Sequence, residues 1–574
     1  MIRTITIGMV VAVLLGLAAQ VSARQESAVQ IYLAREIVTM DPQQPRAEAV
    51  AVADGRIMGV GTLQDMQALA GDSAVVDERF ADKVIVPGLI EQHIHPVLSA
   101  LTLGSQVISI EEWELPETTF PAARDRQAYF ARLRAVEAAL GSPTEPLVSW
   151  GFHHYFHGEL TREDLDEVSS VRPIVIWHRS GHEFILNTAA LSLAEVTRES
   201  VAASPENIRA QINFDKGHFW ERGAMDFISP RILPLIAAPE KLRAGIEMTE
   251  HYLHQAGVTT SAEPGGVSGF YPQQIAVLGD TDTPFRFYFI PDGRSLTLKY
   301  TGDELLAATA AVQRGAEGHT AFLPQQVKLF ADGAIFSQLM QMQDGYLDGH
   351  HGEWLMDEAV YRDAFRTYWD AGYQIHVHQN GDEGLERVLD VLEENMQRNP
   401  RQDHRTTIVH FGFSTPAQVK RIAALGAIVS ANPYYTVALA DQYSKFGVGP
   451  ERANEMVRLG DVARAGVSFS LHSDMPMAPA RPLYLMWAAV NRTTFSGRVA
   501  KPDLGISVEQ ALRAVTLDAA YSLRLENEIG SITAGKRANF TVLATSPFAV
   551  KPEAIKDIDV WGTVLEGRLQ PATR

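Results

Sequence analysis

Short apolar runs that end in polar residues recur through the middle of the chain, and most are followed by residues with the helical spacing of apolar positions. This alternation is typical of parallel β-strands joined by crossover helices. The runs cover residues 84–90, 258–263, 285–290, 327–330, 374–378, 407–410, 427–431 and 467–474. Eight such strands predict an α/β fold built on a (β/α)₈ TIM barrel, whose functional face is formed by the C-terminal ends of the strands.

The spacing of the predicted strands is uneven. About 160 residues separate the first two strands, whereas two strands and their crossover helix need only about 30 residues. We therefore expect an inserted subdomain after the first strand, at about residues 97–257, that covers the functional face of the barrel.

Both ends of the chain alternate short apolar runs with turn signals. Between residues 29 and 86 the pair Asp54-Gly55 stands at a hairpin position, and residues 539–543 and 560–564 have the same character. These runs predict a small antiparallel sheet at each end. We expect one β-sandwich built from residues 24–87 and 529–574, with the barrel at residues 88–528 between them.

The first 23 residues have the order of a secretory signal peptide. Arg3 supplies a positive charge, residues 7–19 are apolar, and Val21-Ser22-Ala23 is a small-residue cleavage pattern. Cleavage there predicts a periplasmic or secreted protein with no stable membrane association. The alternative is an uncleaved anchor, because the apolar segment 5–21 is only slightly shorter than a membrane span.

The composition of the chain excludes several kinds of site and disfavours some kinds of partner. The chain of 574 residues has no cysteine, which excludes disulfides, thiolate zinc sites and a cysteine nucleophile. Its formal net charge of −19 disfavours nucleic acid and anionic membrane surfaces as partners. We expect a small-molecule substrate, and the sequence leaves open whether the protein forms a homo-oligomer.

A histidine pair follows the first predicted strand. Because alternate residues of a strand face the same side, His93 and His95 are expected to point together into the mouth of the barrel. Paired imidazoles at this spacing suit a divalent metal ion of the zinc type, and a pair without a metal is the simpler alternative. Other strand ends carry further candidates, namely His376, His378, His410 and Asp474.

Lys328 stands in the apolar run 326–330, where its neighbours predict burial. A buried lysine is costly unless it is neutralised, paired or chemically altered. The alternative is a side chain that extends along the strand and places its ammonium group at the barrel rim.

Two further histidines each precede a candidate metal ligand by two residues, which is the repeat of side-chain direction along a β-strand. His376 precedes His378 by two residues and His472 precedes Asp474 by two, which places both inside the barrel, one layer beneath the ligands. Buried neutral imidazoles need hydrogen-bond partners, and we expect each other or Asp332 in that role. They would orient the ligands, with direct ligation and simple packing as alternatives.

The expected insertion holds an unusual concentration of histidines. As a group these residues indicate a polar substrate pocket, whereas histidines that only satisfy hydrogen bonds are the simpler alternative. The candidates are His153, His154, His182, His218 and Trp220.

Five segments carry a resemblance to a known family, at residues 86–95, 327–333, 378–382, 473–476 and 530–536. They are similar to the amidohydrolase superfamily, in its family-three branch, which includes N-substituted formamide deformylases and related metal-dependent hydrolases. The resemblance covers nearly the whole mature chain. It implies one or two divalent metal ions, with Zn²⁺ as the expected ion, held by His93, His95, His378, His410 and Asp474.

The resemblance also implies that Lys328 is a carboxylated lysine that bridges two metal ions. His472 departs from the family pattern, in which a small residue is more typical at that position. The chain is also similar to a secreted branch whose members are named exoenzyme regulatory proteins.

These observations predict an exported metal-dependent hydrolase that cleaves an amide-like carbon–nitrogen bond, other than a peptide bond, with metal-activated water. Asp474 is expected to serve as the general base. A lactone or ester hydrolase would use the same centre. A non-catalytic regulatory protein that retains the metal site, or a metal scavenger, is the alternative from another functional class.

Overall fold

The structure is a computed structural model that describes residues 29–572. The predicted signal peptide at residues 1–23, and residues 24–28 of the expected sandwich, lie outside the described residues. Within residues 29–572, no helix has both the length and the hydrophobicity that a membrane crossing requires.

Both ends of the described chain contribute to one seven-stranded sheet, in the order β24-β23-β22-β4-β1-β2-β3. Its strands are β1 (Gln30–Val38), β2 (Arg46–Ala53), β3 (Arg56–Gly61), β4 (Val75–Pro87), β22 (Phe540–Leu543), β23 (Val560–Leu565) and β24 (Arg568–Pro571). β2 and β3 form the predicted hairpin, in which Asp54 and Gly55 both have positive φ, as a tight hairpin turn requires.

The pairing inside this sheet is mixed. β22 pairs antiparallel with β4, whereas β1 pairs parallel with β4. The expectation of purely antiparallel pairing is therefore wrong at β1, because β2, β3 and α2 (Leu63–Ala70) form a crossover between β1 and β4. Rings from both chain ends pack together, since Phe80 lies 5.5 Å from Tyr32 and 5.4 Å from Trp561 between ring centres.

The middle of the chain forms two parallel sheets, in the orders β16-β15-β14-β5 and β17-β18-β19-β20-β21. Isolated parallel bridges join Asp292, just after β15, to Lys328 of β17, and Ile94, after β5, to Met475, after β21, so the two sheets adjoin on both sides. The fold is therefore mixed α/β. The strands are β5 (Leu89–Glu91), β14 (Val258–Gly266), β15 (Arg286–Pro291), β16 (Thr320–Phe322), β17 (Gln326–Phe330), β18 (Gln374–Gln379), β19 (Thr407–His410), β20 (Ile428–Ala431) and β21 (Phe469–Leu471).

The first predicted strand, at residues 84–90, is divided between two sheets. Residues up to Pro87 belong to β4 and pair with β22, whereas β5 starts at Leu89 and pairs with β14. Gly88 lies at the break, where its N–H donates to the Asn539 carbonyl at 2.9 Å. A continuous apolar run cannot reveal such a division, because both halves are buried.

Helices follow most strands of the two parallel sheets. Several begin at strong N-caps, such as Thr415, whose side chain accepts the Gln418 N–H in a capping box. The helices are α12 (Tyr271–Leu278), α13 (Gly293–Thr297), α14 (Gly302–Val312), α15 (Glu358–Asp370), α16 (Asp382–Arg398), α17 (Pro416–Leu425), α18 (Tyr434–Gln442), α19 (Pro450–Asn454), α20 (Leu459–Arg464), α21 (Pro482–Asn491), α22 (Val508–Ala514) and α23 (Leu517–Ser522).

Between α3 (Pro96–Leu103) and α11 (Pro239–Gln255) the chain builds a six-stranded sheet, in the order β12-β13-β11-β10-β9-β6. Its strands are β6 (Gln106–Val107), β9 (Leu147–Phe152), β10 (Ile174–His178), β11 (Glu183–Leu186), β12 (Ile212–Asn213) and β13 (His218–Trp220), and β7 (Trp113–Glu114) and β8 (Thr119–Phe120) form a separate pair. The helices are α4 (Arg126–Ala139), α5 (His154–His157), α6 (Arg162–Asp166), α7 (Thr188–Leu193), α8 (Arg198–Ala202), α9 (Glu206–Arg209) and α10 (Ser229–Ile236).

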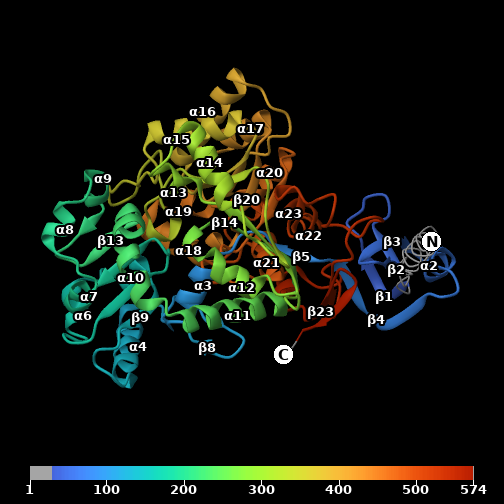
Figure 1. Cartoon of the computed structure of the whole chain (residues 1–574), viewed down its shortest axis with the longest axis horizontal. Coiled ribbons are helices and arrows are strands. Elements are labelled where there is room, and N and C mark those ends of the chain that lie inside the picture. Colours follow the sequence, from blue (N-terminus) through green and yellow to red (C-terminus); the bar gives the residue numbers. More distant parts are fainter. Residues whose placement is uncertain (1–28, 573–574) are drawn as a thin grey trace, which may run out of the picture.

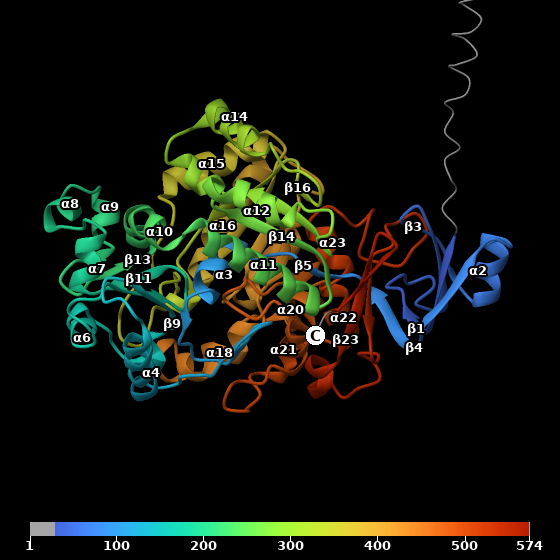
Figure 2. The same cartoon turned by 60° about the horizontal axis from the view of Figure 1, so that its bottom comes forward.

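The three parts lie in a row. In Figure 1 the seven-stranded sheet, with β1 to β4, lies at one end of the molecule, and the inserted segment, with β13 and α6 to α9, lies at the other. The two parallel sheets and their helices lie between them, and the turned view in Figure 2 shows the same separation.

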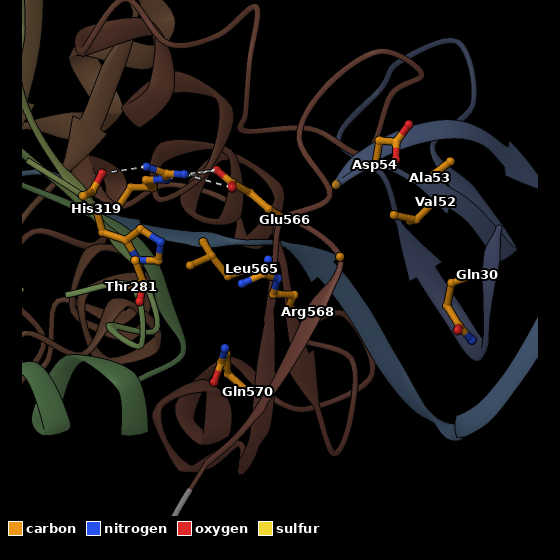
Figure 3. A pocket seen from close by; sticks show the side chains of 14 residues that line it. Gln30, Val52, Ala53, Asp54, Thr281, His319, Leu565, Glu566, Arg568 and Gln570 are labelled. Carbon is orange, nitrogen blue, oxygen red and sulfur yellow. Dashed lines mark hydrogen bonds and ion pairs between the residues drawn. The ribbon is translucent and has the colours of Figure 1, made fainter. Parts of the chain in front are cut away.

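Ion pairs join the seven-stranded sheet to the middle of the molecule. Arg286 of β15 donates to both carboxylate oxygens of Glu566 at 2.9 Å, and Arg537 donates to the same carboxylate at 2.8 Å. Figure 3 shows Glu566 in a surface pocket that Gln30 and Asp54 line from the sheet. None of the predicted site residues lines this pocket. Because these side chains are partly exposed, the ion pairs contribute little stability and mainly orient the sheet.

The break between β4 and β5 has no room for a side chain at Gly88, which allows a prediction. A Cβ atom on Gly88 would lie 2.1 Å from Thr259 Oγ1 and 2.8 Å from Thr259 Cγ2. We predict that Gly88→Ala destabilises the protein by about 1–3 kcal/mol, a usual cost of overpacking, because β14 has to move away from β5. The midpoint of urea denaturation measures the loss.

Gly141→Ala is the matched control, since no atom lies within 4 Å of a Cβ built there. Thr259→Ala in the Gly88→Ala background should recover part of the loss, because it removes the contacts to Oγ1 and Cγ2 and leaves only that to Thr259 Cβ, at 2.9 Å. Equal midpoints for the two single glycine variants would contradict the prediction.

Candidate active site

The predicted metal ligands gather at the C-terminal ends of the parallel strands. All are buried except His95, whose side chain is 21% exposed. They are His93 and His95 just after β5, Lys328 in β17, His378 in β18, His410 at the end of β19 and Asp474 just after β21.

Asp474 brings the two histidines of the first strand together. Its Oδ1 lies 3.2 Å from His95 Nε2 and 3.5 Å from His93 Nε2. Its backbone N–H donates to the His93 carbonyl, and the His95 N–H donates to the Met475 carbonyl, both at 2.9 Å. Both imidazoles therefore point to one carboxylate, as the alternation of residues predicts.

His410 extends the cluster on the other side of Asp474. Its Nδ1 lies 3.6 Å from Asp474 Oδ2, and its ring centre is 4.5 Å from that of His378. His410 and Asp474 both have left-handed backbones, with φ of 75° and 58°. Such a conformation costs a non-glycine residue on the order of 1–3 kcal/mol, so the fold holds these two side chains in place at the expense of local strain.

Lys328 is buried, with 1% of its surface exposed. Its Nζ has no hydrogen-bond partner among residues 29–572 and lies 5.6 Å from the centre of the Phe330 ring. Burial lowers the pKa of Lys328 to about 7, although the charges of Asp474 and Asp292 oppose this shift. The alternative in which the ammonium group reaches the barrel rim is therefore wrong.

Burial also sets the charge of the histidines. It lowers the pKa of His93, His378, His410 and His472 well below the usual value, and the charges of Lys328 and neighbouring imidazoles add to the shift. Neutral imidazole is the form that binds a metal. Burial disfavours protonated His95 as well, but its hydrogen bonds to Asp474 and Glu263 outweigh burial and raise its pKa to about 9.

His472 touches the ligand histidines directly. Its Nε2 lies 3.2 Å from His410 Nδ1, and its ring centre lies 4.7 Å from that of His93. Its Nδ1 lies 2.8 Å from Ser430 Oγ, which accepts a hydrogen bond from Gln92 Nε2. This chain of hydrogen bonds orients the His472 ring toward His410.

His376 has a different environment. Its Nε2 lies 2.9 Å from Gln326 Oε1, and burial lowers its pKa to about 3. The expected pairing of His376 with His472 or Asp332 is therefore wrong. β19 and β20 separate the strands of the two histidines, and the Asp332 carboxylate instead accepts the backbone N–H groups of Gln341, Asn380 and Gly381 at 2.7–3.0 Å.

One residue of the predicted substrate pocket lies beside the metal ligands. The His182 ring centre is 5.8 Å from that of His378, and its Nδ1 lies 2.7 Å from Glu221 Oε2. Glu221 also accepts the Ala334 N–H at 2.8 Å, which fixes its carboxylate against the loop after β17.

The other four predicted pocket residues lie elsewhere. His154, His218 and Trp220 line a separate cavity together with Glu183. His153 is buried, where its Nδ1 accepts the Tyr155 N–H and its Nε2 lies 3.4 Å from Gln338 Nε2. The structure thus divides the expected single pocket, and a role of these residues in substrate binding stays a prediction.

Two carboxylates at the site, Glu263 and Glu91, are not among the predicted site residues. Glu263 Oε1 lies 3.4 Å from His95 Nδ1, and since Glu263 ends a predicted strand, the rule that found the histidines could also have found it. Glu91 accepts the N–H groups of His93 and Ser473 at 3.1–3.3 Å, and burial raises its pKa to about 8. No local pattern marks Glu91, because its partners are backbone groups, one two residues away and the other in a distant segment.

The donor set fits a divalent metal ion. Imidazole nitrogens and a carboxylate are the usual ligands of zinc sites without cysteine. Two overlapping groups place one ligand atom from each member within 4.8 Å of the others, namely His93, His95 and Asp474, and His93, His410 and His472. Among the described residues, His93 Nδ1 is a further buried polar atom without a hydrogen-bond partner.

Comparisons with known proteins agree with this geometry. A family model described as "Amidohydrolase family" matches residues 81–570. The chain is 24% identical to Protein LONG AFTER FAR-RED 3 of Arabidopsis thaliana, over 89% of this chain and 86% of that protein. It is 26% identical to N-substituted formamide deformylase of Arthrobacter pascens, over 93% of this chain and 96% of that protein.

Among solved structures, an uncharacterized metal-dependent hydrolase from Pyrococcus horikoshii OT3 shares the fold. The TM-score is 0.69 at 19% sequence identity, with 92% of this chain and 99% of that chain covered.

The contact between Glu263 and His95 generates a prediction. A carboxylate that accepts the Nδ1–H of His95 keeps its Nε2 directed at Asp474, so Glu263→Gln should lower metal affinity or hydrolytic activity about 10–100-fold. Metal content after dialysis against a chelator, and activity in the same samples, measure the effect. Glu240→Gln, at an exposed position of α11, is the control. Unchanged metal retention and activity in Glu263→Gln would show that the contact between Glu263 and His95 does not orient the His95 ring.

Proposed function

The chain belongs to the amidohydrolase family, and on this premise we propose that it is a metal-dependent hydrolase that cleaves a carbon–nitrogen bond, other than a peptide bond, in a small molecule. The observation that carries the proposal is the convergence of His93, His95 and His410 on the Asp474 carboxylate. The relative named as an N-substituted formamide deformylase supports the choice of bond.

His93, His95, His378, His410 and Asp474 would hold one or two metal ions, with Zn²⁺ as the expected ion. A divalent metal ion at such a site polarises a carbonyl group and lowers the pKa of water. Burial keeps His93, His378 and His410 neutral, which supports this role, whereas His95, with its pKa raised to about 9, has to lose a proton before it binds a cation.

Asp474 would act as the general base. One carboxylate oxygen faces His93 and His95, and the other faces His410, so the group is held at the centre of the cluster. A carboxylate in this position can take a proton from the attacking water and pass it to the leaving nitrogen. Glu91 supports this function because it binds the backbone N–H of Ser473, next to the base.

His182 is the residue of the insertion that we propose contacts the substrate. Its position beside His378 brings it to the ligand cluster, and the Glu221 carboxylate fixes its Nδ1. The imidazole can then donate a hydrogen bond to a substrate oxygen without reorientation.

We also propose that the two parallel sheets form one eight-stranded barrel. The bridges from Asp292 to Lys328 and from Ile94 to Met475 support this closure. β16 and β17 would together occupy one position of the barrel, since β16 pairs with β15 and β17 pairs with β18.

Export of the protein is a further part of the proposal. The order of Arg3, the apolar residues 7–19 and the small residues 21–23 supports a cleaved signal peptide and a periplasmic or secreted enzyme. The net charge of −19 supports a small-molecule substrate over a nucleic acid.

The proposed function predicts the behaviour of the first histidine pair. At this site the protein as isolated should contain one to two transition-metal ions per chain, and His93→Ala with His95→Ala should abolish these ions and hydrolysis together. Elemental analysis and assays with N-substituted formamides, N-acyl amino acids and lactones test this. His319→Gln, at a partly buried position outside the predicted site, is the control. Hydrolysis of lactones alone would change the bond class, and full activity in the double variant would refute the metal mechanism.

Lys328 generates a separate prediction. Its buried amine can attack carbon dioxide with formation of an N–C bond and loss of one proton, and the resulting carbamate would supply the negative charge to bridge two metal ions. Protein loaded with metal in ¹³C-labelled bicarbonate should show a carbamate resonance in its ¹³C NMR spectrum.

Lys328→Ala should lose this resonance, whereas Lys420→Ala, at an exposed position of α17, should keep it. An active, fully metallated wild-type protein without the resonance would exclude carboxylation and favour a single metal ion.

A further inference from the structure

The insertion carries a second cluster of metal-ligating side chains, outside the site described above. His154 lies in α5, His178 ends β10, Glu183 begins β11 and His218 begins β13. β11 lies between β10 and β13 in the six-stranded sheet, so neighbouring strands bring three of these residues together. α5 follows β9, the other neighbour of β10, and adds the fourth.

Glu183 is the centre of this cluster. Its Oε2 lies 2.6 Å from His218 Nε2 and 3.3 Å from His154 Nε2, and its Oε1 lies 3.4 Å from His178 Nδ1. Ligand atoms of His154, His178 and Glu183 all lie within 4.8 Å of one another. The rings of His154 and His178 are stacked, with centres 4.9 Å apart.

Two polar atoms of the cluster lack hydrogen bonds. Among the described residues, His178 Nε2 and Glu183 Oε1 are buried and have no hydrogen-bond partner. A buried polar atom without a partner costs about 1–3 kcal/mol, so such atoms are rare in native proteins. A bound cation would satisfy the carboxylate oxygen and give the imidazoles a common partner.

A cation has a path to this cluster. His154, Glu183 and His218 line a cavity of about 310 Å³, together with Lys216 and Trp220. The side chains of His154 and His218 are about one-quarter exposed, whereas those of His178 and Glu183 are buried. The cluster thus has two ligands at the cavity wall and two behind them.

The cluster is separate from the site at the strand ends. Glu183 directly follows His182, whose ring lies beside His378 and whose Nδ1 binds Glu221. Glu183 instead contacts His154, His178 and His218. His182 lies in the bend before β11 and Glu183 is the first residue of that strand, and their side chains contact different clusters.

We propose that His154, His178, Glu183 and His218 bind a divalent transition-metal ion of the zinc class in the insertion, in addition to the metal of the proposed hydrolase. Three imidazoles and one carboxylate form a nitrogen-rich, oxygen-containing donor set, which suits Zn²⁺, Co²⁺ or Cu²⁺ and not Mg²⁺ or Ca²⁺. The ion would fasten α5, β10, β11 and β13 to one another and so fix the position of His182.

The test uses the full chain with His93→Ala and His95→Ala, so that the strand-end site is impaired. This protein is stripped with a chelator, incubated with Zn²⁺, freed of unbound ion and subjected to elemental analysis. We expect about one more Zn²⁺ per chain than in the same protein with the added change Glu183→Gln. Equal zinc content in the two proteins would overturn the proposal and leave a hydrogen-bonded network centred on Glu183.

If the Glu183→Gln protein does not fold, a second variant and a second measurement still test the proposal. His218→Gln changes a residue at the cavity wall, and Co²⁺ bound to imidazole and carboxylate ligands gives visible ligand-field bands. We expect these bands in the parent protein and in the control His319→Gln, and their loss in His218→Gln. Identical Co²⁺ spectra in parent and His218→Gln would reject the site.

Thermal stability supplies the last readout, because an ion that binds only the folded chain raises the melting temperature. Added Zn²⁺ should raise the melting temperature of the parent protein and of His319→Gln but not of His218→Gln. An equal rise in all three would also overturn the proposal. Because the parent protein carries His93→Ala and His95→Ala, its zinc response tests the insertion site separately from hydrolysis at the strand-end site.

Discussion

The burial of one amine and several imidazoles at the ends of the parallel strands determines how the candidate site is organised. Removal from water disfavours the charged form of such groups, and burial lowers the pKa of Lys328 to about 7 and that of His376 to about 3. The charge of Asp474 offsets part of this cost at Lys328. The buried nitrogen atoms that lack a partner need a cation or a hydrogen-bond donor. The cost of burying each group is therefore offset only when the whole cluster is assembled.

Carboxylates that bind backbone N–H groups hold this unit in place. Asp332 accepts three such groups from two loops, and Glu91 accepts those of His93 and Ser473. Each carboxylate therefore joins segments that lie far apart in the sequence. The geometry of the ligands is set by the backbone before any substrate arrives, which is the condition for electrostatic stabilisation without reorganisation.

Most strands of the two parallel sheets, though not β16, and the side on which His93, His95 and Asp474 lie could be predicted, because apolar runs and a period of two residues are local properties of the sequence. The partners of His376 and His472 could not, because the order of strands decides them. Nor could the division at Gly88, since both halves of the apolar run are buried. Strands as short as β6, with two residues, carry too little periodicity to reveal the sheet of the insertion.

The seven-stranded sheet also constrains the order in which the chain can fold during synthesis. Leu89 and Thr541, which are hydrogen-bonded beside the β4–β22 pair, lie 452 residues apart, so β4 leaves the ribosome long before its neighbour exists. Until then one edge of β4 presents unpaired backbone groups, which are a template for pairing with another chain. Contacts of such high contact order form late. A chain that stops before Phe540 would retain this open edge permanently. We expect such a truncated chain to be prone to aggregation.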